Sequence, residues 1–193
     1  TLPEIIEKGK KNGQRDLTIK SAQEVYLLEP NLGPGVLGGI QIPGESITCT
    51  FTAPIAFATT AVMNGIRWLG GTHVRHVVKE SAAYRLFTNN GTLQCRVLNN
   101  AAGLYSDEIA RMVGFDRFKI TPRRGEFIIL DKHARSLLSH IILPIPTKIT
   151  KGVLISPTIY GNVLLGPTAD NIHDKSDTST TIGGLENLIT KAT

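Results

Sequence analysis

Cationic side chains supply the first candidates for chemistry in this chain of 193 residues. Arg124, next to Arg123, carries a guanidinium that can hold a phosphate or a carboxylate through two parallel hydrogen bonds. We therefore predict that Arg124 binds the anionic end of a small substrate. The competing interpretation, equally favoured for either arginine alone, is that the two form ion pairs with Glu126 and Asp131.

Other reactive residue types give weaker indications. The five histidines have no metal-site spacing, and His73 and His76 would point to opposite faces of a strand. His140 precedes a predicted strand and could act as a base, although a structural or surface role is favoured. No G-x-S-x-G motif, P-loop or Cys–His nucleophile is present. We therefore predict no hydrolase and no metal, and the catalytic base stays unassigned.

Glycines 33, 35 and 38 spell G-x-G-x-x-G, the pattern of dinucleotide-binding turns. That pattern binds a diphosphate only between a strand and a helix. Here Pro30 disrupts a preceding strand, Pro34 lies inside the motif, and Pro43 follows where the helix should run. We interpret the motif as a turn that leads into a strand over residues 36–42.

The stretch 99–127 has a more suitable context for a nucleotide, although on pattern alone an ordinary turn of an α/β protein is the favoured interpretation. It follows an apolar, β-branched run, residues 92–98, that predicts a buried strand. Small residues up to Gly103 then form a turn, Ser106 is a suitable N-cap, and Gly114 is a typical helix end. A strand, a small-residue turn and a capped helix allow the backbone to approach a nucleotide closely.

The remaining patterns predict an α+β protein. Helices are expected over residues 2–11, from a Ser21 cap to Leu28, from Pro54 to Trp68 (largely buried) and over 182–190. Strands 72–79 and 83–88 continue through an Asn89-Asn90-Gly91 hairpin. Short strands of an antiparallel sheet are expected at 118–121, 125–131, 141–145, 153–156 and 163–166, before a loop over 176–181.

Composition narrows the classes of partner. The net charge is +5, but the basic residues are scattered and lack interleaved aromatics, so we predict no nucleic-acid binding. Cys49 and Cys95 have no metal or redox spacing and are expected to be small buried side chains in a reducing cytoplasm. No secretory core or bilayer-spanning stretch is visible, so we predict a soluble cytoplasmic protein and leave peripheral membrane contact open.

Three segments carry a family resemblance: NNAAGLYSD at 99–107, PRRGEFIILDK at 122–132 and TKGVLISPTIYGNVLLGPTAD at 150–170. They resemble FAD-dependent oxidoreductases of the D-amino-acid oxidase superfamily. Within it, they are similar to the FAD-dependent glycerol-3-phosphate dehydrogenases, with 2-hydroxyglutarate oxidases as close relatives. The similarity runs from about residue 29 to residue 188.

The resemblance implies an antiparallel substrate-domain sheet with flanking helices, plus part of a split, Rossmann-like FAD-binding domain. The expected division is 1–50 and 116–175 for the substrate domain, 51–115 for the partial FAD-binding domain, and 176–193 for a terminal loop and helix. The family's initial strand–turn–helix for the FAD diphosphate has no counterpart in this sequence. We therefore interpret the chain as the central part of such an enzyme.

Site residues also follow from the resemblance. The expected FAD contacts are Val74, through its backbone, and the turn Ala101, Ala102 and Gly103. In the substrate pocket the resemblance supports Arg124, with weaker candidates in Lys151 and Thr168, and assigns no role to Tyr160.

The implied reaction is oxidation of glycerol 3-phosphate to dihydroxyacetone phosphate with FAD as hydride acceptor. A 2-hydroxyglutarate oxidase or dehydrogenase is one alternative, and a binding module without redox chemistry is another. A protein and a quinone are the candidate electron acceptors, and the sequence does not decide between them. Alone, the chain is expected to be inactive and to self-associate, because its FAD-facing apolar surface would be uncovered.

Overall fold

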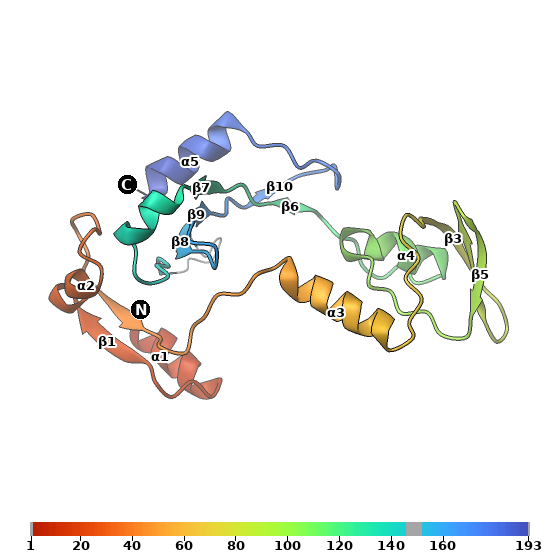
Figure 1. The fold of residues 1–193 in the computed structure, drawn as a ribbon, viewed down its shortest axis with the longest axis horizontal. Coiled ribbons are helices and arrows are strands. Elements are labelled where there is room, and N and C mark those ends of the chain that lie inside the picture. The colour runs from red at the N-terminus through yellow and green to blue at the C-terminus, as the bar shows by residue number, and fades with distance from the viewer. Residues whose placement is uncertain (1, 146–151, 193) are drawn as a thin grey trace. The chain divides into compact units, whose positions relative to one another are not determined.

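A computed structural model describes residues 2–145 and 152–192 (Figure 1). The chain forms two compact units. The first comprises Thr1–Pro54, Gly125–Ala169 and Ser179–Thr193, and the second comprises Ile55–Arg124 and Asp170–Thr178. Every strand pair of the described residues is antiparallel, which agrees with the predicted α+β class.

The first unit begins with α1 (Leu2–Lys11), β1 (Thr18–Ser21), α2 (Ala22–Leu28) and β2 (Gly38–Gln41), with β1 paired to β2. The predicted Ser21 cap is confirmed as a capping box with Glu24: the Ser21 N–H donates to Glu24 Oε2 (2.8 Å), and the Glu24 N–H to Ser21 Oγ (3.3 Å).

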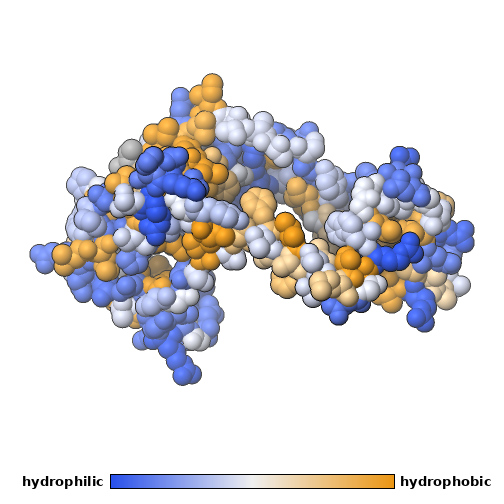
Figure 2. All heavy atoms as spheres, in the orientation of Figure 1, coloured by the Kyte–Doolittle hydropathy of each residue, from blue (hydrophilic) through white to orange (hydrophobic). Residues whose placement is uncertain are grey.

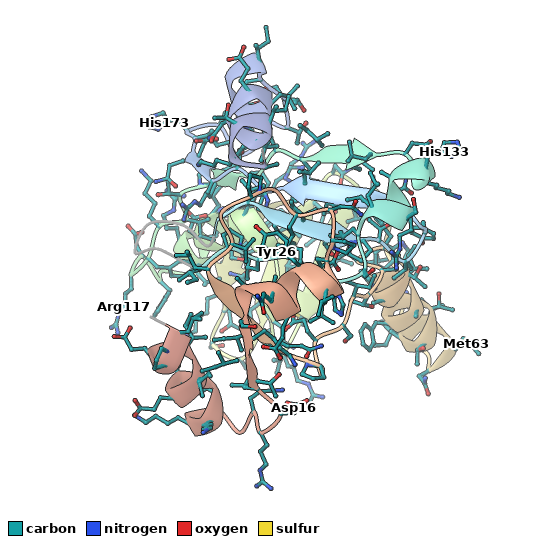
Figure 3. All side chains as sticks on the ribbon, turned by 90° about the vertical axis from the view of Figure 1, so that its left-hand side faces the viewer. Asp16, Tyr26, Met63, Arg117, His133 and His173 are labelled. Atoms are coloured by element: carbon teal, nitrogen blue, oxygen red, sulfur yellow. The ribbon has the colours of Figure 1, made fainter. Side chains whose placement is uncertain are left out.

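The glycine motif at residues 33–38 is a turn, as predicted. The Tyr26 hydroxyl (Figure 3) donates to Gly33 O (3.0 Å) and accepts from the Val36 N–H (3.2 Å). Gly38 then opens β2, and residues 42–51, which follow that strand, contain no helix. The motif therefore lacks the helix N-terminus that a diphosphate needs.

A second sheet of the first unit has the order β7-β9-β8, formed by β7 (Ile128–Leu130), β8 (Leu154–Pro157) and β9 (Val163–Gly166). A 3₁₀ helix, η2 (Lys132–Leu137), follows β7, and α5 (Ile182–Ala192) packs on β9. Val163 and Leu188 are buried there. The strand expected at 141–145 is reduced to a single bridge, between Ile142 and Ile155.

The second unit contains a sheet with the order β3-β4-β5, formed by β3 (Val74–Lys79), β4 (Tyr84–Thr88) and β5 (Gly91–Cys95). A 3₁₀ turn, η1 (Gly103–Tyr105), leads into α4 (Ser106–Met112), which packs on β3 around the buried Val77. β6 (Arg123–Arg124) pairs with β10 (Asp170–Asn171).

The helix predicted to run from Pro54 to Trp68 is shorter and more exposed than expected. α3 spans Thr52–Met63. Gly65, at φ +89°, ends it, because its N–H donates to Val62 O (3.0 Å) and the Ile66 N–H to Ala61 O (3.1 Å), a Schellman motif. The expectation of burial was wrong for the described residues: none of α3 is buried, and its apolar side chains are visible in Figure 2.

Other boundaries also differ. β5 ends at Cys95 and is largely exposed, and residues 118–121 form no strand. Ser106 is not the N-cap, because η1 continues into α4 and Tyr105 occupies the cap position. None of the helices in the described part of the chain combines the length and apolar character that a membrane crossing requires.

Candidate cofactor pocket

An open cavity of about 500 Å³ lies in the second unit, between the sheet and the turn before α4. Val74 and Val77 of β3, with Leu86 of β4, form its sheet side, and the turn brings Ala101 and Ala102 to it. Three of the four predicted FAD contacts therefore line one cavity, although Val74 is 27 positions or more from the other two in the sequence.

Gly103, the fourth predicted contact, begins η1 next to the lining residue Ala102. Its φ of +57° lies in the left-handed region, which a residue with a Cβ adopts only with strain. The glycine is therefore required by the sharp turn that closes the cavity wall.

Asn100 holds the same turn, a role that the sequence reasoning missed. Its Oδ1 accepts from the Ala102 N–H (3.3 Å), and its Nδ2 donates to Ser106 O (2.8 Å). One side chain thus ties the small-residue turn to the first residue of α4. The available signal was an asparagine before a small-residue turn, where its short side chain bonds to nearby backbone.

The hairpin asparagines hold the other side of the cavity. Asn89 Oδ1 accepts from the N–H of His73, a lining residue (2.7 Å), and Asn89 Nδ2 donates to Gly71 O (3.0 Å). The residue predicted only as a hairpin signal therefore also anchors the start of β3.

The lining formed by the described residues carries polar groups such as His73 and Asn100 but no Lys, Arg, Asp or Glu. Such a wall suits a flat, neutral ring, which gains from apolar burial and a few hydrogen bonds. The adenosine part of FAD fits this chemistry. The diphosphate does not, because the cavity wall offers it no cation.

The buried Asp107, at the start of α4, belongs to an ionic cluster. Asp107 accepts from Lys175 Nζ (2.6 Å) at Oδ1 and from the Ile120 N–H (3.1 Å) at Oδ2. The hydrogen bond from Lys175 is the main reason that the pKa of Asp107 falls to about 2, and the same pair raises the pKa of Lys175.

Arg124, the leading substrate-binding candidate, forms an ion pair with Asp177: its Nη1 lies 2.9 Å from Asp177 Oδ2. The Arg124 side chain is 16% exposed, and the residue lies opposite Asp170 in the β6–β10 pair. The interpretation from neighbouring charges missed this distant partner. Glu126 accepts from the N–H of Thr181 (2.9 Å).

The two weaker candidates for substrate binding are Thr168 and Lys151. Thr168 is buried in the first unit, where its Oγ1 accepts from the Glu126 N–H (3.0 Å) and its own N–H donates to Glu126 O (3.1 Å). Its hydroxyl therefore fastens two chain segments together. Lys151 lies outside the described residues.

Cys49 is not the fully buried side chain that we expected. It is half-buried in the first unit, and its Sγ lies 3.1 Å from the Tyr160 hydroxyl and 3.2 Å from Thr52 Oγ1. These hydrogen bonds, the one from the Thr52 side chain above all, lower the pKa of the thiol to about 6. Tyr160, which was given no role, is the second contributor.

The contacts of His140 indicate a structural role, and two of the other histidines are exposed at the surface. His140 Nδ1 lies 2.7 Å from Glu29 Oε1, and the buried Glu29 also accepts from the Ser139 N–H (2.9 Å). This arrangement is the structural role favoured for His140. His133 and His173 (Figure 3) are exposed, and the described residues contain no cluster of His, Cys, Asp or Glu able to hold a metal ion.

Comparison of the chain with known proteins identifies its family. The model of the FAD-dependent oxidoreductase (DAO) family matches residues 1–193. A glycerol 3-phosphate dehydrogenase of Caloramator mitchellensis is 35% identical over 98% of this chain and 39% of its own length. An L-2-hydroxyglutarate dehydrogenase of Nematostella vectensis is 29% identical over 87% of this chain and 40% of its own length.

The structure of L-α-glycerophosphate oxidase from Mycoplasma pneumoniae, with FAD bound, matches with a TM-score of 0.88 and 28% identity. It covers 97% of this chain and 51% of its own, so the chain spans about two fifths to one half of the relatives' lengths. The expected fold class, with part of an FAD-binding domain, is confirmed. The chain belongs to the FAD-dependent oxidoreductase (DAO) family.

Proposed function

We propose that the protein to which this chain belongs oxidises the secondary alcohol of glycerol 3-phosphate to dihydroxyacetone phosphate. The observation that carries the proposal is the 35% identity, over nearly the whole chain, to a relative named glycerol 3-phosphate dehydrogenase. FAD supplies the hydride acceptor in this chemistry. Electrons then pass to a protein or a quinone, and the catalytic base stays unassigned.

Within this chain, we propose that Val74, Ala101 and Ala102 hold the adenosine part of FAD in the cavity that they line. Gly103 supports them by allowing the turn to close next to the ligand. The flat, uncharged wall binds the ring by apolar burial and leaves the charged diphosphate to other groups.

Arg124 is proposed to hold the phosphate of the substrate, with Lys151 and Thr168 as further candidates. The guanidinium carries five N–H donors in a fixed plane, and the ion pair with Asp177 orients that plane. A guanidinium held in this way binds phosphate at a smaller entropic cost than a mobile side chain.

The proposal is tested with the complete protein under anaerobic conditions, by following the visible flavin spectrum. Glycerol 3-phosphate is expected to bleach the flavin, whereas glycerol, without the phosphate, should not. Arg124→Gln should raise the KM about 10- to 100-fold, the effect of losing a charged hydrogen bond. Arg117→Gln is the matched control, because Arg117 is an exposed arginine of the same unit (Figure 3). A flavin that glycerol 3-phosphate leaves oxidised would refute the proposal.

A 2-hydroxy acid such as L-2-hydroxyglutarate is the second candidate substrate. It is favoured by the similarity to the Nematostella vectensis enzyme and by the ability of Arg124 to bind carboxylate as well as phosphate. Bleaching by L-2-hydroxyglutarate at a lower concentration than by glycerol 3-phosphate would establish this alternative.

A binding module without redox chemistry is the third candidate, and exposed apolar side chains of α3 such as Phe57 and Met63 favour it. The same surface supports self-association of the isolated chain. A complete protein that folds but retains no flavin would favour this candidate over both enzymes.

A further inference from the structure

A segment distant in sequence completes the second unit. Residues 170–178, which we call the strap, follow a stretch of the first unit and return to the second. β10, at the start of the strap, pairs with β6, and the Ile172 N–H donates to Pro122 O (3.0 Å). The strap therefore has a defined attachment at its beginning.

Lys175 provides a second attachment, on α4. Its Nζ lies 2.6 Å from Asp107 Oδ1 and 3.0 Å from Glu108 Oε1. The side chains of Lys175 and Asp107 are only 15% and 3% exposed. A pair so shielded from water resists screening, and its disruption leaves a buried carboxylate without its counter-charge.

The same ammonium group contacts the cavity wall. Lys175 Nζ lies 5.4 Å from the centroid of the Tyr105 ring, within the range of a cation–π interaction. Tyr105 lines the cavity, and so does Ile109 of α4. Lys175 thus joins the strap to the turn and the helix that form one side of the pocket.

We propose that Lys175 is a positioning residue for the flavin cofactor. By holding Asp107 and covering the Tyr105 ring, it fixes the orientation of Tyr105 in the wall that receives the adenosine part. The inference rests on the cofactor role proposed above for the cavity. Lys175 itself does not line the cavity, so its effect on the cofactor passes through Tyr105.

The test measures FAD affinity by titrating the apo form of the complete protein and following the quenching of flavin fluorescence. Lys175→Met keeps the apolar stem and removes the charge. We expect it to raise the Kd for FAD about tenfold, because FAD binding must then order the Tyr105 wall that Lys175 otherwise holds in place. Lys175→Arg should restore affinity to within about threefold of the wild type, because a cation returns to the site. Lys79→Met, at an exposed lysine of β3, is the matched control and should leave the Kd unchanged.

A second variant separates positioning from general destabilisation. In a Tyr105→Leu background, Lys175→Met should change the Kd less than about twofold, because the residue through which it acts is gone. A full tenfold effect in that background would overturn the role assigned to Tyr105. Wild-type affinity in Lys175→Met, or no recovery in Lys175→Arg, would overturn the proposal.

Glu108→Gln covers the case in which Lys175→Met does not fold. The Glu108 carboxylate is 42% exposed, so its neutralisation weakens the attachment without uncovering a buried charge. We expect about a threefold rise in the Kd, since a partly exposed ion pair contributes less than a buried one, and an unchanged Kd would count against the proposal. A wild-type protein that binds no FAD would instead refute the cofactor role of the cavity.

Discussion

Two adjacent glycines in the first turn of α5 should respond oppositely to the same substitution. A Cβ added to Gly183 meets nothing within 4 Å, whereas a Cβ added to Gly184 would overlap Glu126 Oε2. Gly183→Ala should therefore raise the free energy of unfolding by up to about 1 kcal/mol, the difference in helix propensity between alanine and glycine. Gly184→Ala has the same propensity gain but must displace Glu126.

The cost of that displacement follows from the contacts of Glu126. The residue is 4% exposed, and its carboxylate accepts from the Thr181 N–H (2.9 Å) and the Thr181 hydroxyl (3.0 Å). Hydrogen bonds to a charged group contribute about 1.5–3 kcal/mol each, so we expect Gly184→Ala to lower the free energy of unfolding by about 2–5 kcal/mol.

Urea unfolding of the two variants, followed by circular dichroism, measures the difference directly. Glu126→Ala provides the internal control: in that background Gly184→Ala should cost less than about 1 kcal/mol, because the overlapping carboxylate is absent. Equal stability of Gly183→Ala and Gly184→Ala in the wild-type background would refute the reasoning.

Three further predictions follow from other contacts. Because the folded-state pKa of Asp107 lies below its usual value, its contribution to stability is present above about pH 4 and is lost as the pH falls towards 2. Asp107→Asn should remove this pH dependence, which urea midpoints between about pH 5 and pH 2 would reveal. Thr52→Val should raise the pKa of the Cys49 thiol and slow its alkylation by iodoacetamide several-fold near about pH 6.5, with Cys49→Ser identifying the signal and an unchanged rate contradicting the assignment. Gly103→Ala should cost about 1–2 kcal/mol of stability, measured by thermal unfolding, since the cost arises from the backbone at φ +57° and no neighbour obstructs the Cβ.

Short sequence patterns predicted several caps and turns of the fold correctly. The Ser21 cap, the hairpin at Gly91 and the end of α4 near Gly114 all depend on a few adjacent residues. Caps and tight turns are decided by short-range hydrogen bonds and by backbone angles, so the pattern predicted these three, although it missed the cap of α4, where Tyr105 replaces the expected Ser106.

Helix ends and burial were less predictable. Asn64 and Gly65 end α3 before residue 68, where the helix was expected to end. A glycine in the left-handed conformation, such as Gly65 or Gly71, can end a helix, and the pattern does not say which glycine is used. The apolar composition of α3 predicts that neighbours must cover it, but burial depends on which segments pack there.

The sequence by itself determined the family, the turn at Ala101–Ala102–Gly103 and the candidate cation Arg124, since each is a property of contiguous residues. Only the tertiary structure decided that Val74 lines the same cavity as that turn, that Arg124 pairs with Asp177, and that Lys175 binds Asp107. The physical reason is that these partners are separated by tens of residues. Folding selects one partner among many of suitable charge and size by satisfying burial and hydrogen bonding over the whole unit at once.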